Sequence, residues 1–169
     1  DRLQVSGNAT LAGTLTLTLI SKFIPAIGQQ FDVLTSNAST GPFAVVDLIN
    51  FPAGLGVCMS YSATTATATI EVDTDGDEVG DPCDPDDDND GVADGADPQP
   101  LDPDVCGDLD ADICDVCAIG TDDFGPLPDF DVANDGLDTD GDGLCDAGDP
   151  DDDNDGVGDA DDPDALDPD

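Results

Sequence analysis

Residues 138–169 read DTDGDGLCDAGDPDDDNDGVGDADDPDALDPD, and they align without gaps to residues 73–104, DTDGDEVGDPCDPDDDNDGVADGADPQPLDPD. The offset is 65 positions, and 22 of the 32 aligned residues are identical. Chance does not produce such agreement, so the two stretches are copies of one repeat, and a longer array is expected. The second half of the chain thus consists of a repeat at 73–104, a cysteine-containing connector at 105–137 and a repeat at 138–169.

Carboxylates recur within each copy at positions 1, 3, 5, 9 and 12 of two successive loops. Calcium takes about 6–8 oxygen ligands at ~2.3–2.6 Å, and alternate short carboxylates on a tightly wound loop place three of them on one inner face. The backbone carbonyl at position 7 adds another oxygen. We therefore predict four calcium loops, with the ligands Asp73, Asp75, Asp77, Val79, Asp81 and Asp84; Asp86, Asp88, Asp90, Val92, Asp94 and Asp97; Asp138, Asp140, Asp142, Leu144, Asp146 and Asp149; and Asp151, Asp153, Asp155, Val157, Asp159 and Asp162.

Position 6 of each loop is where the backbone turns sharply and a side chain is unwelcome. Gly91, Gly143 and Gly156 occupy it in three of the four loops. Glu78 occupies it in the first loop, so we expect that site to be distorted or weaker.

A further loop begins in the connector, where Asp108, Asp110 and Asp112 have the spacing of positions 1, 3 and 5 and are predicted as metal ligands. The next carboxylate, Asp115, falls at position 8 instead of position 9. Residues 116–137 fit the pattern poorly, so the sequence does not show how this loop would be completed.

Loops that follow one another after 13 residues leave no room for the helices that flank the loops of EF-hands and dockerins. The motifs DPDDDNDGV at 84–92 and 149–157 and DTDGDGLCD at 138–146, with interspersed cysteines, resemble thrombospondin type 3 repeats. The resemblance covers residues 73–169. It implies a chain wound around rows of calcium ions, cross-linked by disulfides and with almost no regular secondary structure.

The alternative interpretation of an acidic run is a solvated, disordered tail. The regular spacing argues against a tail. Two carboxylates ~4 Å apart repel by about 4 kcal/mol at an effective dielectric of ~20, so five in one loop are tolerated only around a cation. We therefore expect the order of residues 73–169 to depend on calcium.

Residues 1–72 have the pattern of β-strands separated by turns. In LAGTLTLTLI, residues 11–20, leucine and threonine alternate, which is typical of a half-buried strand. We predict a mainly β protein, in which a small antiparallel β-sandwich, jelly-roll-like or incomplete, precedes the irregular calcium-stapled repeats. The other predicted strands are Leu3–Val5, Gln30–Leu34, Phe43–Ile49, Val57–Tyr61 and Ala66–Val72.

The segments LQVSGNATLAGTL, LISKFIPAIGQQFDVLTS, GPFAVVDL and GLGVCMSYSATT, all within residues 1–72, resemble a β-rich domain of large secreted bacterial surface proteins, including autotransporter-like proteins. Further strands usually precede such sequences in that family, so the resemblance implies that this chain begins partway into the domain. The start, DRLQVSG, has neither an initiator Met nor a signal-peptide pattern, and we expect a processed product or a fragment.

Six cysteines allow 15 disulfide connectivities, and the sequence does not choose among them. Four of them lie within one repeat unit, so we expect those four to pair among themselves, in sequential order, and the remaining two to pair with each other. Zinc or redox chemistry at Cys114-x-x-Cys117 is the alternative, but no histidine helps and the acidic surroundings raise a thiol pKa. The cysteines are Cys58, Cys83, Cys106, Cys114, Cys117 and Cys145.

The chain carries 42 acidic residues against only two cations, Arg2 and Lys22, for a formal net charge of −40. Such a polyanion cannot neutralise nucleic-acid phosphates or bind an anionic membrane surface by charge, which excludes nucleic acid as a partner. No apolar run reaches the ~18 residues of a membrane span, so insertion is not expected. Disulfides and millimolar calcium both favour an extracellular or cell-surface location.

Catalysis is not expected, because the chain has no histidine and its carboxylates are explained as metal ligands. A glycosidase, which needs only two carboxylates facing a cleft, is the one catalytic alternative.

We predict a secreted calcium-binding structural protein, a subunit of a bacterial extracellular filament or surface stalk. Self-association is expected, in one version by donation of a strand to the open β domain of a neighbour. The alternatives are an adhesin or matrix binding module, with Tyr61, Phe124 and Phe130 as anchors, and the stalk of a larger exoenzyme. Glycans are a further expectation, because Asn8-Ala-Thr10 and Asn37-Ala-Ser39 fit the acceptor pattern.

Overall fold

The computed structural model describes residues 3–20, 23–120 and 123–168 of the chain. Clustering of contacts divides the chain into two compact units, Asp1–Asp87 and Asp88–Asp169. All the strands found in the described residues lie in the first unit, which also contains the first acidic loop, residues 73–84. The composition changes at residue 72, but this loop belongs to the same compact unit as the strands.

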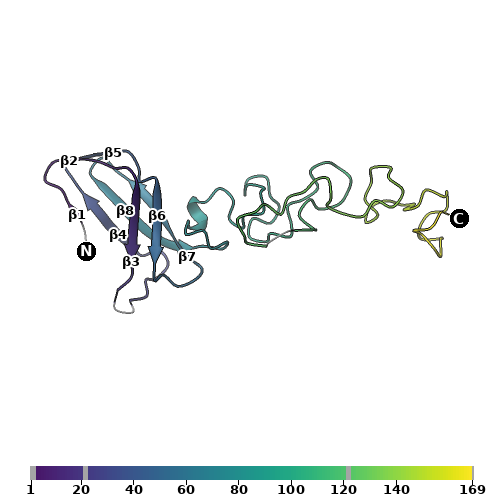
Figure 1. Cartoon of the computed structure of the whole chain (residues 1–169), viewed down its shortest axis with the longest axis horizontal. Coiled ribbons are helices and arrows are strands. Elements are labelled where there is room, and N and C mark those ends of the chain that lie inside the picture. Colours follow the sequence, from purple (N-terminus) through teal and green to yellow (C-terminus); the bar gives the residue numbers. More distant parts are fainter. Residues whose placement is uncertain (1–2, 21–22, 121–122, 169) are drawn as a thin grey trace. The chain divides into compact units, whose positions relative to one another are not determined.

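The first unit is built from short strands (Figure 1). Every predicted strand has a counterpart, although the ends differ and the strand within residues 11–20 is restricted to Thr14–Thr18. Two strands of three residues each were not predicted. The elements are β1 (Leu3–Gln4), β2 (Asn8–Thr10), β3 (Thr14–Thr18), β4 (Gln30–Thr35), β5 (Ala38–Thr40), β6 (Val45–Ile49), β7 (Leu55–Tyr61), β8 (Thr65–Val72) and a single 3-10 turn, η1 (Asp81–Cys83).

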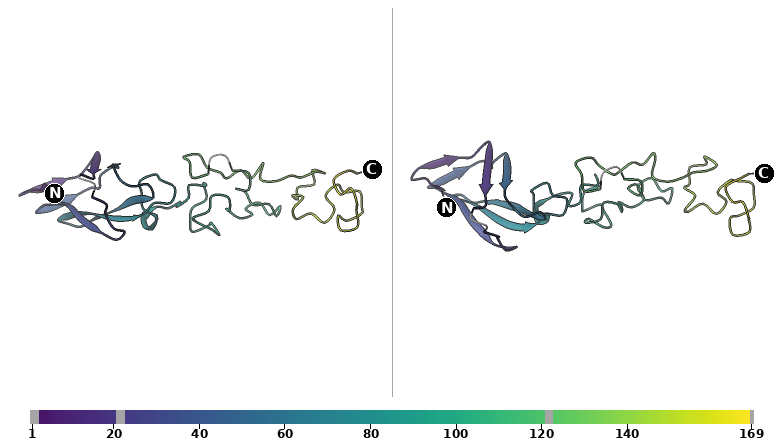
Figure 2. Two further views of the ribbon diagram at one scale, coloured as in Figure 1. Left: turned by 90° about the horizontal axis from the view of Figure 1, so that it is seen from below. Right: turned by 60° about the horizontal axis from the view of Figure 1, so that its bottom comes forward.

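The strand pairing is mixed, so the prediction of an antiparallel sheet is wrong in part. In the four-stranded sheet β1-β4-β8-β7, strand β8 pairs antiparallel with both neighbours. Three strand pairs are parallel, because residues 34–49 run alongside residues 3–18 in the same direction. These pairs are β1–β4, β2–β5 and β3–β6. Parallel pairing needs a long return connection, which residues 19–29 provide. Strands β3 and β6 lie side by side in Figure 1 and in the right view of Figure 2.

An apolar core lies between the four-stranded sheet and the smaller sheets. The predicted alternation in β3 is confirmed, since its threonines are exposed and its leucines are half-buried. Leu17 of β3 and Leu48 of β6 pack against side chains of β7 and β8. The buried members of the two core clusters are Leu11, Leu34 and Ala66, and Val57, Ala68 and Ile70.

The second unit has no helix or strand within its described residues, 88–120 and 123–168. Its apolar cluster contains Val92, Val116 and the two cysteines Cys106 and Cys117, with Phe130 packed against them. The irregular structure that the resemblance implied for the repeats is therefore found in the described residues of this unit. Nowhere in the described parts of the chain does a helix have the length and hydropathy needed to cross a lipid bilayer.

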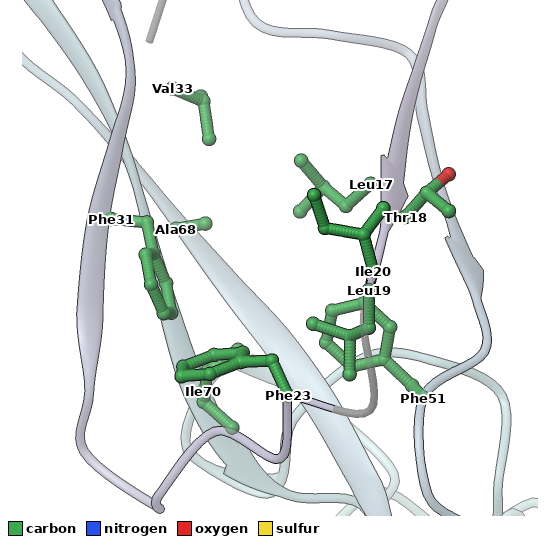
Figure 3. A pocket seen from close by; sticks show the side chains of 10 residues that line it. All are labelled: Leu17, Thr18, Leu19, Ile20, Phe23, Phe31, Val33, Phe51, Ala68 and Ile70. Carbon is green, nitrogen blue, oxygen red and sulfur yellow. The ribbon is translucent and has the colours of Figure 1, made fainter. Parts of the chain in front are cut away.

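An apolar pocket of about 220 Å³ opens beside β3 and β4 in the first unit (Figure 3). Phe31, Ala68 and Ile70 line one side, and Leu17 and Phe51 line the other. The rest of the lining includes Ile20 and Phe23 of the connection after β3, which are 68% and 45% exposed. In the described residues, the first half of β4 pairs with β8 alone, because β1 reaches only Leu34 and Thr35.

Candidate metal-binding loops

In three of the five loops, the first carboxylate holds the backbone in a tight coil through two hydrogen bonds. In the loop that starts at Asp138, the two carboxylate oxygens accept hydrogen bonds from the N–H groups of Gly141, at 2.7 Å, and Gly143, at 3.2 Å. These donors occupy positions 4 and 6. The same pair of bonds is made by Asp73, with Gly76 and Glu78, and by Asp108, with Ala111 and Ile113.

Left-handed backbone at positions 4 and 6 is common to all five loops, including the one in the connector. The glycines predicted to allow the sharp turn, Gly91, Gly143 and Gly156, have φ values of 100°, 96° and 95°. Position 4 is left-handed as well, which the sequence analysis did not anticipate. The complete set of these residues is Gly76 and Glu78, Asn89 and Gly91, Ala111 and Ile113, Gly141 and Gly143, and Asn154 and Gly156.

The coil brings the carboxylates of positions 1, 3 and 5 together, as predicted. The position 5 carboxylate also accepts a hydrogen bond from the N–H of position 7 in every loop, at distances between 2.6 and 2.9 Å. Oxygens of each set lie within 4.8 Å of one another. The sets are Asp73, Asp75 and Asp77; Asp86, Asp88 and Asp90; Asp108, Asp110 and Asp112; and Asp138, Asp140 and Asp142.

In the loop that starts at Asp151, the charge of the carboxylate at position 12 acts on the carboxylate at position 3. Burial raises the pKa of Asp153, and the charges of Asp155, Asp162 and Asp151 raise it further. Asp162 is the residue at position 12. The predicted ligand set of this loop therefore includes carboxylates that the fold places near one another.

Position 9 has a different environment from the one expected of a ligand. Both oxygens of Asp146 accept hydrogen bonds from Thr139 at position 2, one from the backbone N–H at 2.8 Å and one from the hydroxyl at 2.9 Å. Asp81 binds Thr74 in the same way. The position 9 carboxylate thus braces the start of its loop, and its oxygens point at protein donors.

Several buried carboxylate oxygens have no hydrogen-bond donor among the described residues. Oδ2 of Asp153 is one, on a side chain that is only 5% exposed. Others in the repeats are Oδ2 of Asp97, Oδ2 of Asp140 and Oδ1 of Asp151. A buried carboxylate oxygen without a partner is costly, and the compensation is usually a hydrogen-bond donor or a cation. The donor set is all oxygen and strongly anionic, so it fits a hard divalent cation.

The ion-free arrangement is electrostatically unfavourable at Asp75 in the first loop. Burial raises the pKa of Asp75 from 3.8 to about 7, and the nearby charges of Asp77 and Asp73 add to the rise. The backbone N–H of Asp77 opposes this change by hydrogen bonding to the carboxylate. A divalent ion between these carboxylates would remove the repulsion that raises the pKa.

The first loop is attached to the strands through Glu78, which has φ of 82° at position 6. The carbonyl oxygen of Glu78 accepts a hydrogen bond from the N–H of Val57 at 3.1 Å, and Val57 also forms a parallel bridge with Val79. The loop keeps the same two bonds to Asp73 that the loop starting at Asp138 makes with glycine at position 6.

The disulfide prediction is right for one pair and wrong in its order for the others. Cys58 pairs with Cys83, as expected. The remaining four pair among themselves, but as Cys106–Cys117 and Cys114–Cys145 instead of sequentially. The carboxylate of Asp115 explains the first of these pairs, because one of its oxygens accepts hydrogen bonds from the N–H groups of both Cys106 and Cys117.

The same pairing bears on the zinc alternative. Cys114 and Cys117 belong to different disulfides, so neither supplies a thiolate to a metal. The grouping of Asp90 with Cys106 and Cys117 is, for the same reason, a carboxylate beside a disulfide.

Two carboxylates outside the predicted ligand positions belong to the acidic clusters. Asp152 has an unpartnered oxygen, and burial raises its pKa, with further contributions from Asp159, Asp146 and Asp149. Asp135 is 6% exposed, and its pKa is raised by burial and then by Asp112 and Asp110. The run of aspartates at 151–153 could have indicated that Asp152 belongs to an acidic cluster. The spacing of the carboxylates gave no such indication for Asp135.

Comparisons of this chain with models of protein families, with curated proteins and with solved structures found no match. The function of the loops is therefore inferred from their own geometry and chemistry.

Proposed function

We propose that this chain is a secreted, calcium-binding structural protein whose repeats form a spacer held in shape by calcium ions. The observation that carries the proposal is the recurrence of one loop geometry in which the carboxylates of positions 1, 3 and 5 converge. Residues 73–169 have a small apolar core and carry nearly all of the net charge of −40. Without a cation, their mutual repulsion opposes any compact arrangement.

Calcium is proposed over other metals on the basis of the ligands. The loops offer several carboxylates and a position 7 carbonyl each, which suits an ion that takes about 6–8 oxygens in flexible geometry. Magnesium demands near-octahedral coordination and retains its waters, and zinc prefers nitrogen and sulfur. The three disulfides favour an oxidising location, where calcium is abundant, so we place the protein outside the cell or at its surface.

The chain provides its own reporter for a test by chelation. Tyr61 is the only tyrosine and there is no tryptophan, so tyrosine fluorescence reports on strand β7 alone. The Tyr61 hydroxyl accepts a hydrogen bond from the N–H of Phe43 at 3.2 Å, which ties the signal to the packed first unit. Removal of calcium should expand the chain in X-ray scattering and change the circular dichroism, while the Tyr61 signal stays nearly native. An unchanged scattering profile after chelation would contradict the proposal.

Self-association is part of the proposed function. The apolar pocket beside β3 lies next to the half of β4 that, among the described residues, pairs with β8 alone, and this combination fits a strand from a second copy that adds to the sheet and fills the pocket. Such strand addition would link copies into the proposed filament.

Substitution of Ile20, which is 68% exposed at the pocket, tests this step without disturbing the core. Ile20→Lys should abolish assembly in calcium while leaving thermal unfolding unchanged. Sedimentation velocity and electron microscopy would measure assembly, with exposed Leu101 as the site of a matched Leu101→Lys control in the second unit. Monodisperse wild-type monomers at high concentration would count against polymerisation.

A binding module is the alternative, with aromatic side chains as its anchors. Phe130 does not serve as one, because it packs against the cluster of Val92 and Val116. Tyr61 and Phe124 are only partly exposed, at 38% and 42%. The structural role is therefore the better supported of the two.

A further inference from the structure

The connector between the two repeats contains a loop whose ligand set is incomplete along the sequence. Asp108, Asp110 and Asp112 bring oxygens within 4.8 Å of one another, as in the other loops. Position 12, which is aspartate in each of the four repeat loops, is here occupied by Ile119, whose side chain cannot ligate a metal. Three carboxylates alone are fewer than the repeat loops provide.

A buried carboxylate from a distant part of the chain, that of Asp135, lies near this cluster. Its side chain is 6% exposed, and its Oδ2 has no hydrogen-bond donor among the described residues. Burial raises the pKa of Asp135, and the charges that add most to this effect are those of Asp112 and Asp110. The buried carboxylate is therefore close enough to Asp112 and Asp110 for their charges to act on it.

A disulfide holds Asp135 in this place. The neighbouring residue, Gly136, lies so close to the Cys114–Cys145 disulfide that a Cβ atom at this position would collide with both sulfur atoms. Cys114 occupies position 7 of the connector loop, and the N–H of Cys145 binds the carbonyl of Asp112 at 3.0 Å. The disulfide thus fixes the chain segment at Asp135 beside the loop that lacks a carboxylate.

We propose that Asp108, Asp110, Asp112 and Asp135 form a fifth divalent-cation site, selective for calcium, in which Asp135 takes the role that position 12 has in the repeat loops. The proposal rests on the calcium-binding function proposed above and extends it to the connector. The carbonyl of Cys114 at position 7 completes a set of oxygen ligands. An ion here would link the connector loop to the residues just before the second repeat, so that the array is continuous through the connector.

The test counts ions bound to the intact, oxidised chain by native mass spectrometry at a fixed free calcium concentration. Asp135→Asn keeps the size of the buried side chain and removes its charge, and Asp110→Asn removes an exposed member of the cluster without changing the core. Asp123→Asn is the matched control, because Asp123 is an exposed connector residue whose φ of 52° suits asparagine. Asp142→Asn, in a repeat loop, serves as the positive control.

Both Asp135→Asn and Asp110→Asn should bind one calcium ion fewer than the wild-type chain, whereas Asp123→Asn should bind the wild-type number. If Asp142→Asn loses an ion while both connector variants retain the full number, the fifth site is refuted and the proposed function stands. If the wild-type chain binds no calcium, both proposals fail. Peptide mapping of the disulfides shows whether each variant has folded, and loss of an ion in exposed Asp110→Asn alone, with Asp135→Asn unchanged, would overturn the role of Asp135.

Discussion

The carboxylate of Glu78 accepts a hydrogen bond from the backbone N–H of Leu48 at 2.8 Å, and so joins the first acidic loop to strand β6. Glu78 occupies the position that glycine holds in three other loops, and left-handed backbone costs a residue with a side chain about 1–2 kcal/mol. The departure from the glycine pattern thus has a structural role, because the glutamate side chain attaches the loop to the sheet.

Replacement of Glu78 should weaken the first unit. Glu78→Ala leaves the N–H of Leu48 without its charged acceptor, and we expect the free energy of unfolding to fall by about 1–3 kcal/mol. Glu78→Gly should cost less, since glycine relieves the left-handed strain, and Glu78→Gln should be mildest because it retains an acceptor oxygen. Urea unfolding followed by Tyr61 fluorescence in excess calcium measures all three. Equal stability of Glu78→Ala and the wild-type chain would show that the bond contributes nothing.

Asp115 should control which cysteines pair during oxidative folding. Its carboxylate accepts hydrogen bonds from the N–H groups of Cys106, Gly107 and Cys117, which places the two cysteines side by side. Each hydrogen bond to a charged group contributes about 1.5–3 kcal/mol, so Asp115→Ala should lower the ratio of native to scrambled pairing by about tenfold or more. Peptide mapping after refolding in calcium measures the ratio. Asp131→Ala is the control, because Asp131 is an exposed connector residue.

The clusters of carboxylates in the acidic loops could be predicted from sequence because their members are close together in the chain. Carboxylates at positions 1, 3 and 5 converge through local coiling alone, and the local hydrogen bonds of Asp138 reproduce that coil. The connector loop shows the limit of such reasoning. Ala111 and Ile113 adopt the left-handed conformations that the pattern associates with glycine, and the carboxylate of Asp135 reaches the loop only through tertiary structure.

In the β domain, too, features set by neighbouring residues could be predicted from the sequence, whereas features set by distant residues could not. Alternation in Thr14–Thr18 and in the other strands marks where strands occur, because burial on one face is a local property. Whether two strands pair parallel or antiparallel depends on the path of the chain between them. The alternation of apolar and polar residues carries no information about that path. Disulfide order was missed for a related reason, since it depends on the side chain of Asp115.

Calcium affinity of the first loop should fall on acidification through neutral pH. The pKa of Asp75 in the ion-free fold is raised from 3.8 to about 7, chiefly by burial. Protonation therefore stabilises the ion-free fold, an effect that is fully present below pH 3.8 and lost as the pH rises through about 7. Calcium needs the deprotonated carboxylate, so its stabilising effect has the opposite dependence.

The measurement compares thermal unfolding with and without calcium at about pH 8 and about pH 5.5. We expect the calcium-induced rise in melting temperature to be larger at the higher pH, and the ion-free chain to be more stable at the lower pH. Asp75→Asn should remove much of the pH dependence in the ion-free state. A calcium effect of equal size at both pH values would contradict the assignment of Asp75 as a ligand.

The carboxylates of positions 5 and 9 should respond differently to the same substitution. Asp77 at position 5 lies in the cluster with Asp73 and Asp75, whereas both oxygens of Asp81 at position 9 bind Thr74, at 2.9 Å and 3.0 Å. Asp77→Asn should therefore lose the ion of this loop at moderate calcium concentrations. Asp81→Asn keeps an acceptor for the N–H of Thr74, and its amide can donate to the threonine hydroxyl, so the ion count should stay unchanged.

Thr74→Val tests whether Asp81 holds the loop in place through Thr74 or binds the metal directly. The substitution removes the hydroxyl donor without changing any carboxylate. If Asp81 acts through Thr74, neither Thr74→Val nor Asp81→Asn should weaken calcium binding by more than about tenfold, since Thr74→Val loses one hydrogen bond of ~1 kcal/mol and Asp81→Asn retains both bonds to Thr74 in uncharged form. Calorimetric titration of calcium into the variants measures this factor. Loss of an ion in Asp81→Asn together with wild-type binding in Thr74→Val would instead assign the position 9 carboxylate to the metal.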